Sequence, residues 1–221
     1  MVLMPRVTPD GHVYFKVVLW GPKGSGKTTT IKELYLLTTK GNTKIFPVTP
    51  LSKIDRNGSS TIFFDHGIFQ IGKIENGTKG VFLQVFTVAG SERFKPIRKV
   101  LLRDIDGIVF VFDGQSGELE KNEKSIRELT EILRNENVKL GKDILFFIQI
   151  NYPNKNIISK VALEKIKKLF IQENLVSTNF SEYVSGVFET VATQQINIYE
   201  MFETIANQLI DKYLAREINI K

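Results

Sequence analysis

The chain alternates between nearly continuous apolar runs and segments whose apolar residues recur at helical spacing. The apolar runs, rich in β-branched and aromatic residues, are 13–20, 107–112 and 143–150. The segments with helical spacing are 27–39, 119–138, 161–173 and 198–213. Continuous apolar runs are typical of strands in a parallel sheet that helices cover on both faces. The pattern predicts an α/β domain with such a sheet at its centre.

Two further apolar segments point to an antiparallel pair. Residues 61–64 and 80–88 flank Glu75-Asn76-Gly77-Thr78, and Asn-Gly is a strong hairpin turn signal. A last strand is expected near residues 187–191. The fold class is therefore a single doubly wound α/β domain, whose sheet is mostly parallel with one antiparallel edge strand.

Length agrees with one domain, because 221 residues with 42% hydrophobic content suit a single core. We predict a short extension over 1–12, the domain over 13–216 and a tail over 217–221. Residues 40–60 are rich in Gly, Asn, Thr, Pro, Ser and Lys, which predicts a mobile loop of the length that is usually functional.

Composition excludes several classes of protein. There is no cysteine, so disulfides, Cys/His zinc sites, thiol chemistry and prenyl or palmitoyl anchors are excluded. Because the sequence begins Met1-Val2 and not Met-Gly, we expect no myristoyl anchor, and no apolar run reaches the ~20 residues that cross a bilayer. The net charge of +6 weakly favours anionic partners, but aromatic residues do not alternate with the charges as in nucleic-acid modules. We expect a cytoplasmic protein.

The segment Gly21–Thr28 matches every fixed position of the phosphate-binding loop G-x-x-x-x-G-K-[ST]. It follows a predicted strand and opens a predicted helix, which aims backbone N–H groups and the helix dipole at phosphates. Lys27 adds charge toward the β- and γ-phosphates, and the Thr28 hydroxyl can ligate Mg²⁺. The alternative is a glycine turn that binds nothing. The predicted nucleotide contacts are Gly21, Gly24, Ser25, Gly26, Lys27, Thr28 and Thr29.

Three later stretches resemble one protein family. They are Thr61-Ile62-Phe63-Phe64-Asp65, Thr87-Val88-Ala89-Gly90 and Asp106-Gly107-Ile108-Val109-Phe110-Val111. With the phosphate loop, their order resembles the Ras-like small GTPases, and more closely the MglA-type branch of bacteria and archaea. The resemblance implies a Ras-like P-loop NTPase domain that binds GTP or GDP with Mg²⁺ and hydrolyses GTP. It also implies effectors that bind switch loops 41–61 and 89–103, and a roadblock-fold (MglB-like) homodimer as a partner.

The resemblance assigns roles in the two switches. Thr61 would contact Mg²⁺ and the γ-phosphate only in the triphosphate state, and Gly90 would meet the γ-phosphate through its N–H. For Thr61 the alternative is a β-forming threonine at the start of a strand. Ras-like proteins usually have Asp where this chain has Thr87, and MglA-type proteins share the threonine. Asp65 either supplies the missing charge to Mg²⁺ or caps a turn with His66, so the predicted metal residues are Thr28, Thr61 and Asp65.

Hydrolysis is expected to be slow. After the second-switch glycine, Ras-like enzymes carry a glutamine that orients the attacking water, whereas this chain has Ser91, which is too short. Arg56 lies near the position where MglA-type proteins carry an internal arginine finger. Arg56 is either that finger or a solvated loop residue. The predicted catalytic residues are Arg56, Thr61, Gly90 and Ser91.

Base recognition departs furthest from the family. Its Asn-Lys-x-Asp pattern corresponds to Asn151-Tyr152-Pro153-Asn154, where Tyr152 would stack over the base. Asn154 replaces an aspartate that accepts two hydrogen bonds from guanine, a loss of about 2–3 kcal/mol. A backbone N–H near Ala192 would meet the guanine O6. Alternatively, 151–154 is only a turn.

Two questions remain open at this level. The basic run Arg93, Lys95, Arg98, Lys99 and Arg103 is either a solvated helix face or a surface for an acidic partner or membrane. Because of Thr87, Ser91 and Asn154, the alternatives to a GTPase switch are a pseudo-GTPase that holds nucleotide structurally and a P-loop ATPase.

Overall fold

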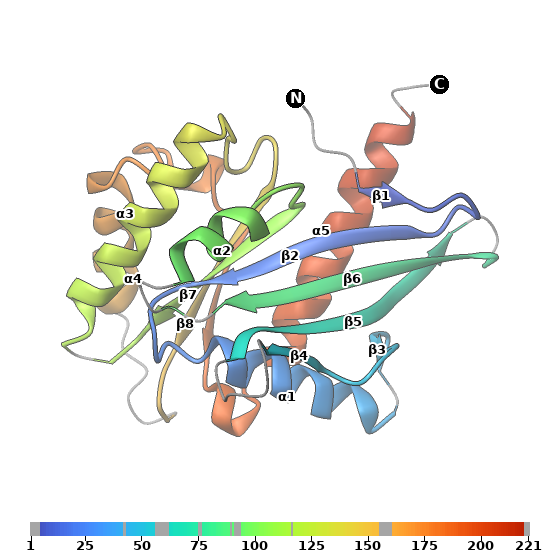
Figure 1. The fold of residues 1–221 in the computed structure, drawn as a ribbon. Coiled ribbons are helices and arrows are strands. Elements are labelled where there is room, and N and C mark those ends of the chain that lie inside the picture. The colour runs from blue at the N-terminus through green and yellow to red at the C-terminus, as the bar shows by residue number, and fades with distance from the viewer. Residues whose placement is uncertain are drawn as a thin grey trace.

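The computed structural model describes residues 5–41, 43–55, 62–74, 77–88, 90, 94–115, 117–154 and 161–218, with the side chains of 53–55, 62–64, 161–162 and 214–218 left out. A central mixed sheet lies between two layers of helices (Figure 1). The predicted α/β class is confirmed. Within the described residues, no helix is long and apolar enough to cross a membrane.

The sheet has the order β3-β5-β6-β2-β7-β8-β9. Its parallel strands are β2 (Val13–Trp20), β6 (Lys79–Val88), β7 (Gly107–Asp113), β8 (Leu145–Asn151) and β9 (Gly186–Thr190). The long strand β5 (Ile62–Ile74) runs antiparallel to β6, with Ile74 opposite Lys79. This confirms the predicted hairpin, which closes at the end where Gly77 has a φ of 86°.

Three short strands were not predicted. β3 (Phe46–Pro47) and β4 (Ser52–Asp55) both pair antiparallel with β5, inside the segment predicted to be a loop. β1 (Arg6–Val7) pairs antiparallel with the start of β2, inside the predicted extension. Strands of two to four residues carry too little periodicity to be recognised locally, because pairing with a distant strand stabilises them.

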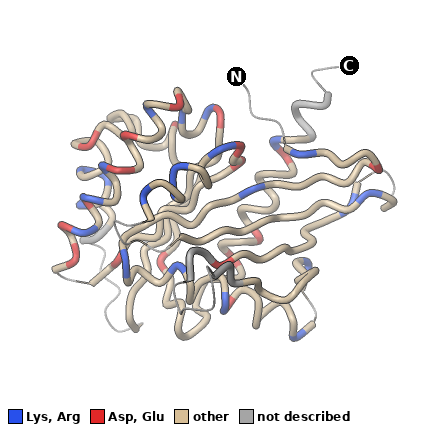
Figure 2. Tube along the Cα trace, viewed as in Figure 1, with Lys and Arg blue, Asp and Glu red and all other residues tan. Residues whose placement is uncertain are grey.

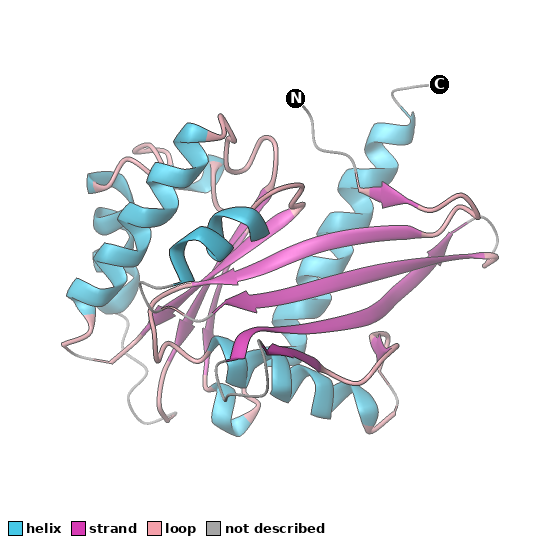
Figure 3. Cartoon of the chain, viewed as in Figure 1, coloured by secondary structure: helices cyan, strands magenta, loops and turns pink. Residues whose placement is uncertain are grey.

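Each face of the sheet packs its own helices (Figure 3). Helices α1 (Lys27–Thr39) and α5 (Ile198–Ile218) cover one face, where Ile31, Leu34, Phe202 and Ile205 are fully buried. The other face packs against α3 (Leu119–Asn135) and α4 (Val161–Gln172), and the short α2 (Lys95–Leu101) lies beside β6. Short 3-10 turns at Phe180–Glu182 and Ala192–Gln194 flank β9.

The register brings the carboxyl ends of the parallel strands to one edge. Leu19 of β2 lies opposite Thr87 of β6, and Asp113 of β7 lies opposite Asn151 of β8. The loop that follows β2, residues 21–26, therefore begins at the same end of the sheet as Thr87, Asp113 and Asn151. In open α/β sheets, ligands bind at this edge.

Candidate nucleotide-binding site

The loop between β2 and α1 has a backbone that glycine alone adopts readily. Gly21, Gly24 and Gly26 have φ values of 150°, 90° and 99°. A Cβ at Gly21 would lie 2.2 Å from the Val111 carbonyl oxygen, and a Cβ at Gly26 would lie 2.3 Å from the Asn151 Nδ2 atom. The first and last glycines thus pack against the next strands, and the loop is fixed at both ends.

Lys27 folds back over this loop. Its side chain is buried, and its Nζ donates hydrogen bonds to the carbonyl oxygens of Gly21 at 2.7 Å and Pro22 at 2.6 Å. Burial, and then the positive charge of Arg98, lower the pKa of Lys27 to about 7, while Asp113 opposes this. Burial disfavours the charged form of Lys27, and an anion bound in the loop would stabilise that form.

The loop fits a phosphate group and a metal ion. The Ser25 Oγ atom is buried and has no hydrogen-bond partner within the described residues, so it is a donor without an acceptor. Gly24 has open space around its Cα, Thr28 is exposed and Thr29 is half-buried at the start of α1. Oxygen ligands such as the Thr28 hydroxyl, together with phosphate oxygens, are what Mg²⁺ prefers. The described residues hold no group of three His, Asp or Glu side chains suited to a metal.

Asn151 connects the phosphate loop to the loop after β9. Its Nδ2 donates to the Ser25 carbonyl oxygen at 3.0 Å. Its Oδ1 accepts hydrogen bonds from the Ala192 backbone N–H at 3.0 Å and the Thr190 hydroxyl at 3.2 Å. The side chain thus uses both ends of its amide to join loops that are about forty and more than a hundred residues away in sequence.

Two predicted base contacts lie differently from expectation. The Tyr152 ring is 1% exposed and packs in the core against Gly114, so it offers no open face for stacking. The prediction of stacking is therefore wrong for this conformation, because the ring fills the space that Gly114 leaves. The Ala192 N–H is bound to Asn151 and is not directed at a base. Asn154 is half-buried in the turn that follows Tyr152.

Asp65 lies inside β5 and not in a turn, so its predicted alternative as a turn cap is wrong. It is 3% exposed and directly opposite Thr87. The Thr87 hydroxyl donates to Asp65 Oδ2 at 3.1 Å and accepts from the Asp65 N–H at 3.3 Å. Ras-like proteins usually carry a carboxylate at the position of Thr87. In this chain a carboxylate, that of Asp65, lies instead on the neighbouring strand and contacts Thr87.

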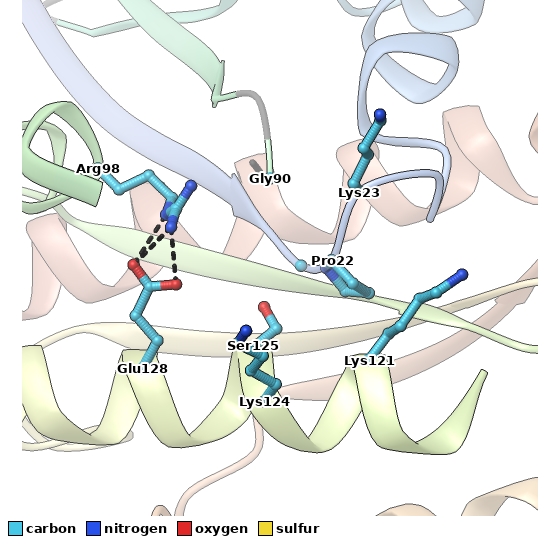
Figure 4. Close-up of a pocket in the computed structure, with 9 residues that line it drawn as sticks. Pro22, Lys23, Gly90, Arg98, Lys121, Lys124, Ser125 and Glu128 are labelled. Atoms are coloured by element: carbon cyan, nitrogen blue, oxygen red, sulfur yellow. Dashed lines mark hydrogen bonds and ion pairs between the residues drawn. The ribbon is translucent and has the colours of Figure 1, made fainter. Parts of the chain in front are cut away.

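The phosphate loop borders a cavity of about 310 Å³ on the side of α2 and α3 (Figure 4). Gly90 approaches the loop so closely that a Cβ there would lie 2.5 Å from the Lys23 backbone nitrogen. Arg98 of α2 and Glu128 of α3, which form an ion pair, both line the cavity. The residues that line it are Gly21, Pro22, Lys23, Gly90, Arg98, Lys121, Lys124, Ser125 and Glu128.

The three basic residues of α2 form ion pairs with acidic residues in α3 or directly after it. Figure 2 shows where basic and acidic residues lie along the chain. Lys95 pairs with Glu131 at 3.4 Å, and Lys99 pairs with Glu136 at 3.4 Å. Together with the Arg98–Glu128 pair, these contacts use three cations of the basic run within the molecule. The expected solvated face is confirmed for Lys95 and Lys99, whose side chains are exposed, and is wrong for Arg98, which is buried.

Three predicted catalytic residues, Arg56, Thr61 and Ser91, lie outside the described residues. Conversely, sequence reasoning missed two polar groups of the site. Asp113 ends β7, is 5% exposed and acts on the charge of Lys27. Gln149 is fully buried in β8, and its Nε2 donates to the hydroxyls of Thr30 and Thr190, both at 2.9 Å. The signal for Gln149 was one amide in an otherwise apolar strand.

Comparison with known proteins agrees with this geometry. The profile of the Ras family matches residues 16–211. The chain is 28% identical to the mutual gliding-motility protein MglA of Myxococcus xanthus over 88% of this chain and 90% of that protein. It is 30% identical to the Ras-related protein Rab-8B of Homo sapiens over 93% of this chain and 82% of that protein. The match to the Ras family profile covers most of the sequence, and this chain belongs to the Ras family of small GTPases.

Proposed function

We propose that this protein is a Mg²⁺-dependent guanine-nucleotide switch that hydrolyses GTP slowly. The observation that carries the proposal is the phosphate loop, with Lys27 buried on the Gly21 and Pro22 carbonyl oxygens and Ser25 Oγ left without a partner. This loop stands at the carboxyl edge of the sheet, before the N-terminus of α1. Such an arrangement stabilises the charge of a nucleotide's phosphates through backbone N–H groups and one ammonium.

Magnesium binding is assigned to three residues. The exposed Thr28 hydroxyl would ligate Mg²⁺ directly, and Thr61 would complete the ligand set in the triphosphate state. Asp65, fixed by Thr87, would supply the negative charge. When bound, the ion neutralises charge on the β- and γ-phosphates. In most Ras-like proteins this negative charge belongs to an aspartate at the position of Thr87 on β6. Here it would belong to Asp65 on the neighbouring strand, β5.

Guanine recognition is assigned to Asn151, Asn154 and the loop at Ala192. The contacts of Asn151 with Ser25 and Ala192 support a role in setting the distance between the base end and the phosphate end. Asn154 would then contact the base edge with one acceptor and one donor. Because the family's aspartate is absent, we expect weaker selection of guanine over other bases.

Slow turnover follows from Ser91, whose hydroxyl is too short to orient water as a glutamine does. Gly90 lies against the phosphate loop, which supports contact of its N–H with the γ-phosphate. Arg56 would neutralise charge in the transition state once the switch loops 41–61 and 89–103 are held. A roadblock-fold homodimer is the partner proposed to hold them, through positioning rather than a catalytic side chain of its own. We place the protein in the cytoplasm.

The test is single-turnover phosphate release with and without the cognate roadblock protein, on the wild type and on Arg56→Ala. The partner should accelerate the wild type by about 10³-fold or more, and Arg56→Ala should lose that acceleration while GTP affinity stays nearly unchanged. Equal responses of the two proteins would reduce Arg56 to a loop residue. The nucleotide that co-purifies with the protein, identified by chromatography, reports base and phosphate number; ATP there would refute the guanine assignment.

A second candidate is a pseudo-GTPase, an interaction module that holds nucleotide without hydrolysing it. The specific features that favour it are Ser91 in place of glutamine and Thr87 in place of aspartate. Absence of phosphate release under every condition, with GTP bound tightly, would establish this candidate instead.

A further inference from the structure

Helix α2 places one buried cation beside the phosphate loop. Arg98 is 5% exposed. Its Nε lies 2.9 Å from Glu128 Oε1, and its Nη2 lies 2.7 and 2.9 Å from the two carboxylate oxygens. On the other side, its Cζ lies 5.8 Å from the centroid of the Trp20 ring, and the Trp20 Nε1–H is bound to the Ser125 carbonyl oxygen at 3.0 Å. The guanidinium group is therefore fixed in position and orientation.

The fixed guanidinium faces the phosphate site. Arg98 lines the same cavity as Gly21, Pro22 and Gly90 (Figure 4). Its positive charge acts on Lys27 of the loop. Glu128, which pairs with Arg98, lines the same cavity and offsets part of this charge.

Attachment of α2 to α3 does not by itself explain this pair. Lys95–Glu131 and Lys99–Glu136 already join the two helices at exposed positions. Exposed pairs of this kind each contribute little, and a buried pair costs desolvation that hydrophobic residues would avoid. A buried arginine at this place is better explained by a task for its charge.

We propose that Arg98 is a specificity-determining residue that favours nucleoside triphosphate over diphosphate. It would do so by placing a fixed positive charge on the side of the phosphate loop where Gly90 meets the γ-phosphate. The inference rests on the proposed function. Glu128 and Trp20 hold the guanidinium so that no reorganisation is needed when the extra phosphate arrives. One fixed charge at this range, partly offset by Glu128, is expected to change the ratio of GTP to GDP affinity by about tenfold.

The experiment measures the affinities of GTP and GDP, at saturating Mg²⁺, for the wild type and four variants. Arg98→Gln should lower the GTP/GDP affinity ratio about tenfold, and Arg98→Lys, which keeps the charge, should retain most of it. The matched control is Arg127→Gln, which removes an arginine of α3 that pairs with Glu123 and Glu173 at the surface. It should leave the ratio unchanged.

Glu128→Gln separates the electrostatic role from a structural one. Removing the negative charge should raise the GTP/GDP affinity ratio or leave it unchanged. If the Arg98–Glu128 pair only held α2 in place, Glu128→Gln should instead lower the ratio, as Arg98→Gln does. A fall in Glu128→Gln, or equal losses of GTP and GDP affinity in Arg98→Gln, would overturn the proposal. If Arg98→Gln does not fold, Arg98→Lys and Glu128→Gln decide in the same way. A wild type that binds no guanine nucleotide refutes the proposed function itself, and this inference with it.

Discussion

The phosphate half of the candidate site and its base half are built differently. The phosphate half consists of backbone N–H groups, three glycines with positive φ and the buried Lys27, and every fixed position of the motif is present. The proposed base half depends on the side chains of Asn151 and Asn154, and of these only Asn151 matches the family pattern. A site formed by backbone requires particular residues wherever φ is unusual. A site formed by side chains can change its ligand through single substitutions.

The largest effect is expected from Lys27→Ala. Removing the buried ammonium leaves phosphate charge unpaired in the loop, which should cost about 3–5 kcal/mol, or roughly 10²- to 4 × 10³-fold in nucleotide affinity. Binding of a fluorescent guanine nucleotide measures the loss, and circular dichroism checks that the fold survives. Lys32→Ala, an exposed position of the same helix, is the control and should bind normally. Normal affinity in a folded Lys27→Ala would refute the phosphate-loop assignment.

Asn154→Asp tests the base half. An aspartate accepts two hydrogen bonds from the guanine N1–H and 2-amino groups, so guanine preference should rise by about 2–3 kcal/mol, or ~30- to 150-fold. Calorimetric titration with GTP and ATP on both proteins gives the preference. Weaker binding of GTP relative to ATP in the variant would show that residues 151–154 do not contact the base.

Asp65→Asn probes the carboxylate beside Thr87. Asparagine can still accept the Thr87 hydrogen bond, but it lacks the charge, so the Mg²⁺ concentration for half-maximal GTP binding should rise about tenfold. GDP affinity without Mg²⁺ should stay constant. Asp211→Asn, an exposed carboxylate of α5, serves as the control for net charge. An unchanged Mg²⁺ requirement would remove Asp65 from the metal site.

The smallest effect concerns pH. Burial first, and then the charge of Arg98, lower the pKa of Lys27 to about 7 in the nucleotide-free protein. Bound phosphate favours the charged form, so binding takes up a proton above pH 7 and affinity falls as pH rises, by about tenfold between pH 7 and 8.5. Below pH 7 Lys27 is already charged and contributes no slope. Lys27→Arg stays charged and should remove the dependence; the same slope in both proteins would assign it to another group.

The sequence predicted those parts of the fold that carry their own periodicity. Helix α1 has the predicted bounds, and the stripe of α3 at Ile126, Leu129, Ile132 and Leu133 is buried as expected. The Asn-Gly turn correctly indicated the β5–β6 hairpin. β1, β3 and β4 escaped because their few residues are ordered by partners elsewhere in the chain, and no local pattern records such pairing.

Within the site, the phosphate loop was readable because one contiguous segment contains it. The polar pairs were not, because Asp65 and Thr87 are 22 residues apart and Arg98 and Glu128 are 30 apart. Only the strand register and the packing of α2 on α3 bring them together. The stacking prediction for Tyr152 failed for a related reason. The Tyr152 ring is buried against Gly114, which lies in the loop after β7, and the residues around Tyr152 in the sequence do not show this contact.

Asn151 has a consequence for engineering. One amide side chain joins the carbonyl group of Ser25 to the backbone of Ala192, so it sets the spacing of these two loops. Tyr152 is buried in the core beside Gly114, so a loop grafted from a relative with another base preference must keep both Asn151 and Tyr152 and change only the residues from Pro153 on. A graft that replaces Asn151 would lose the contacts with both loops at once.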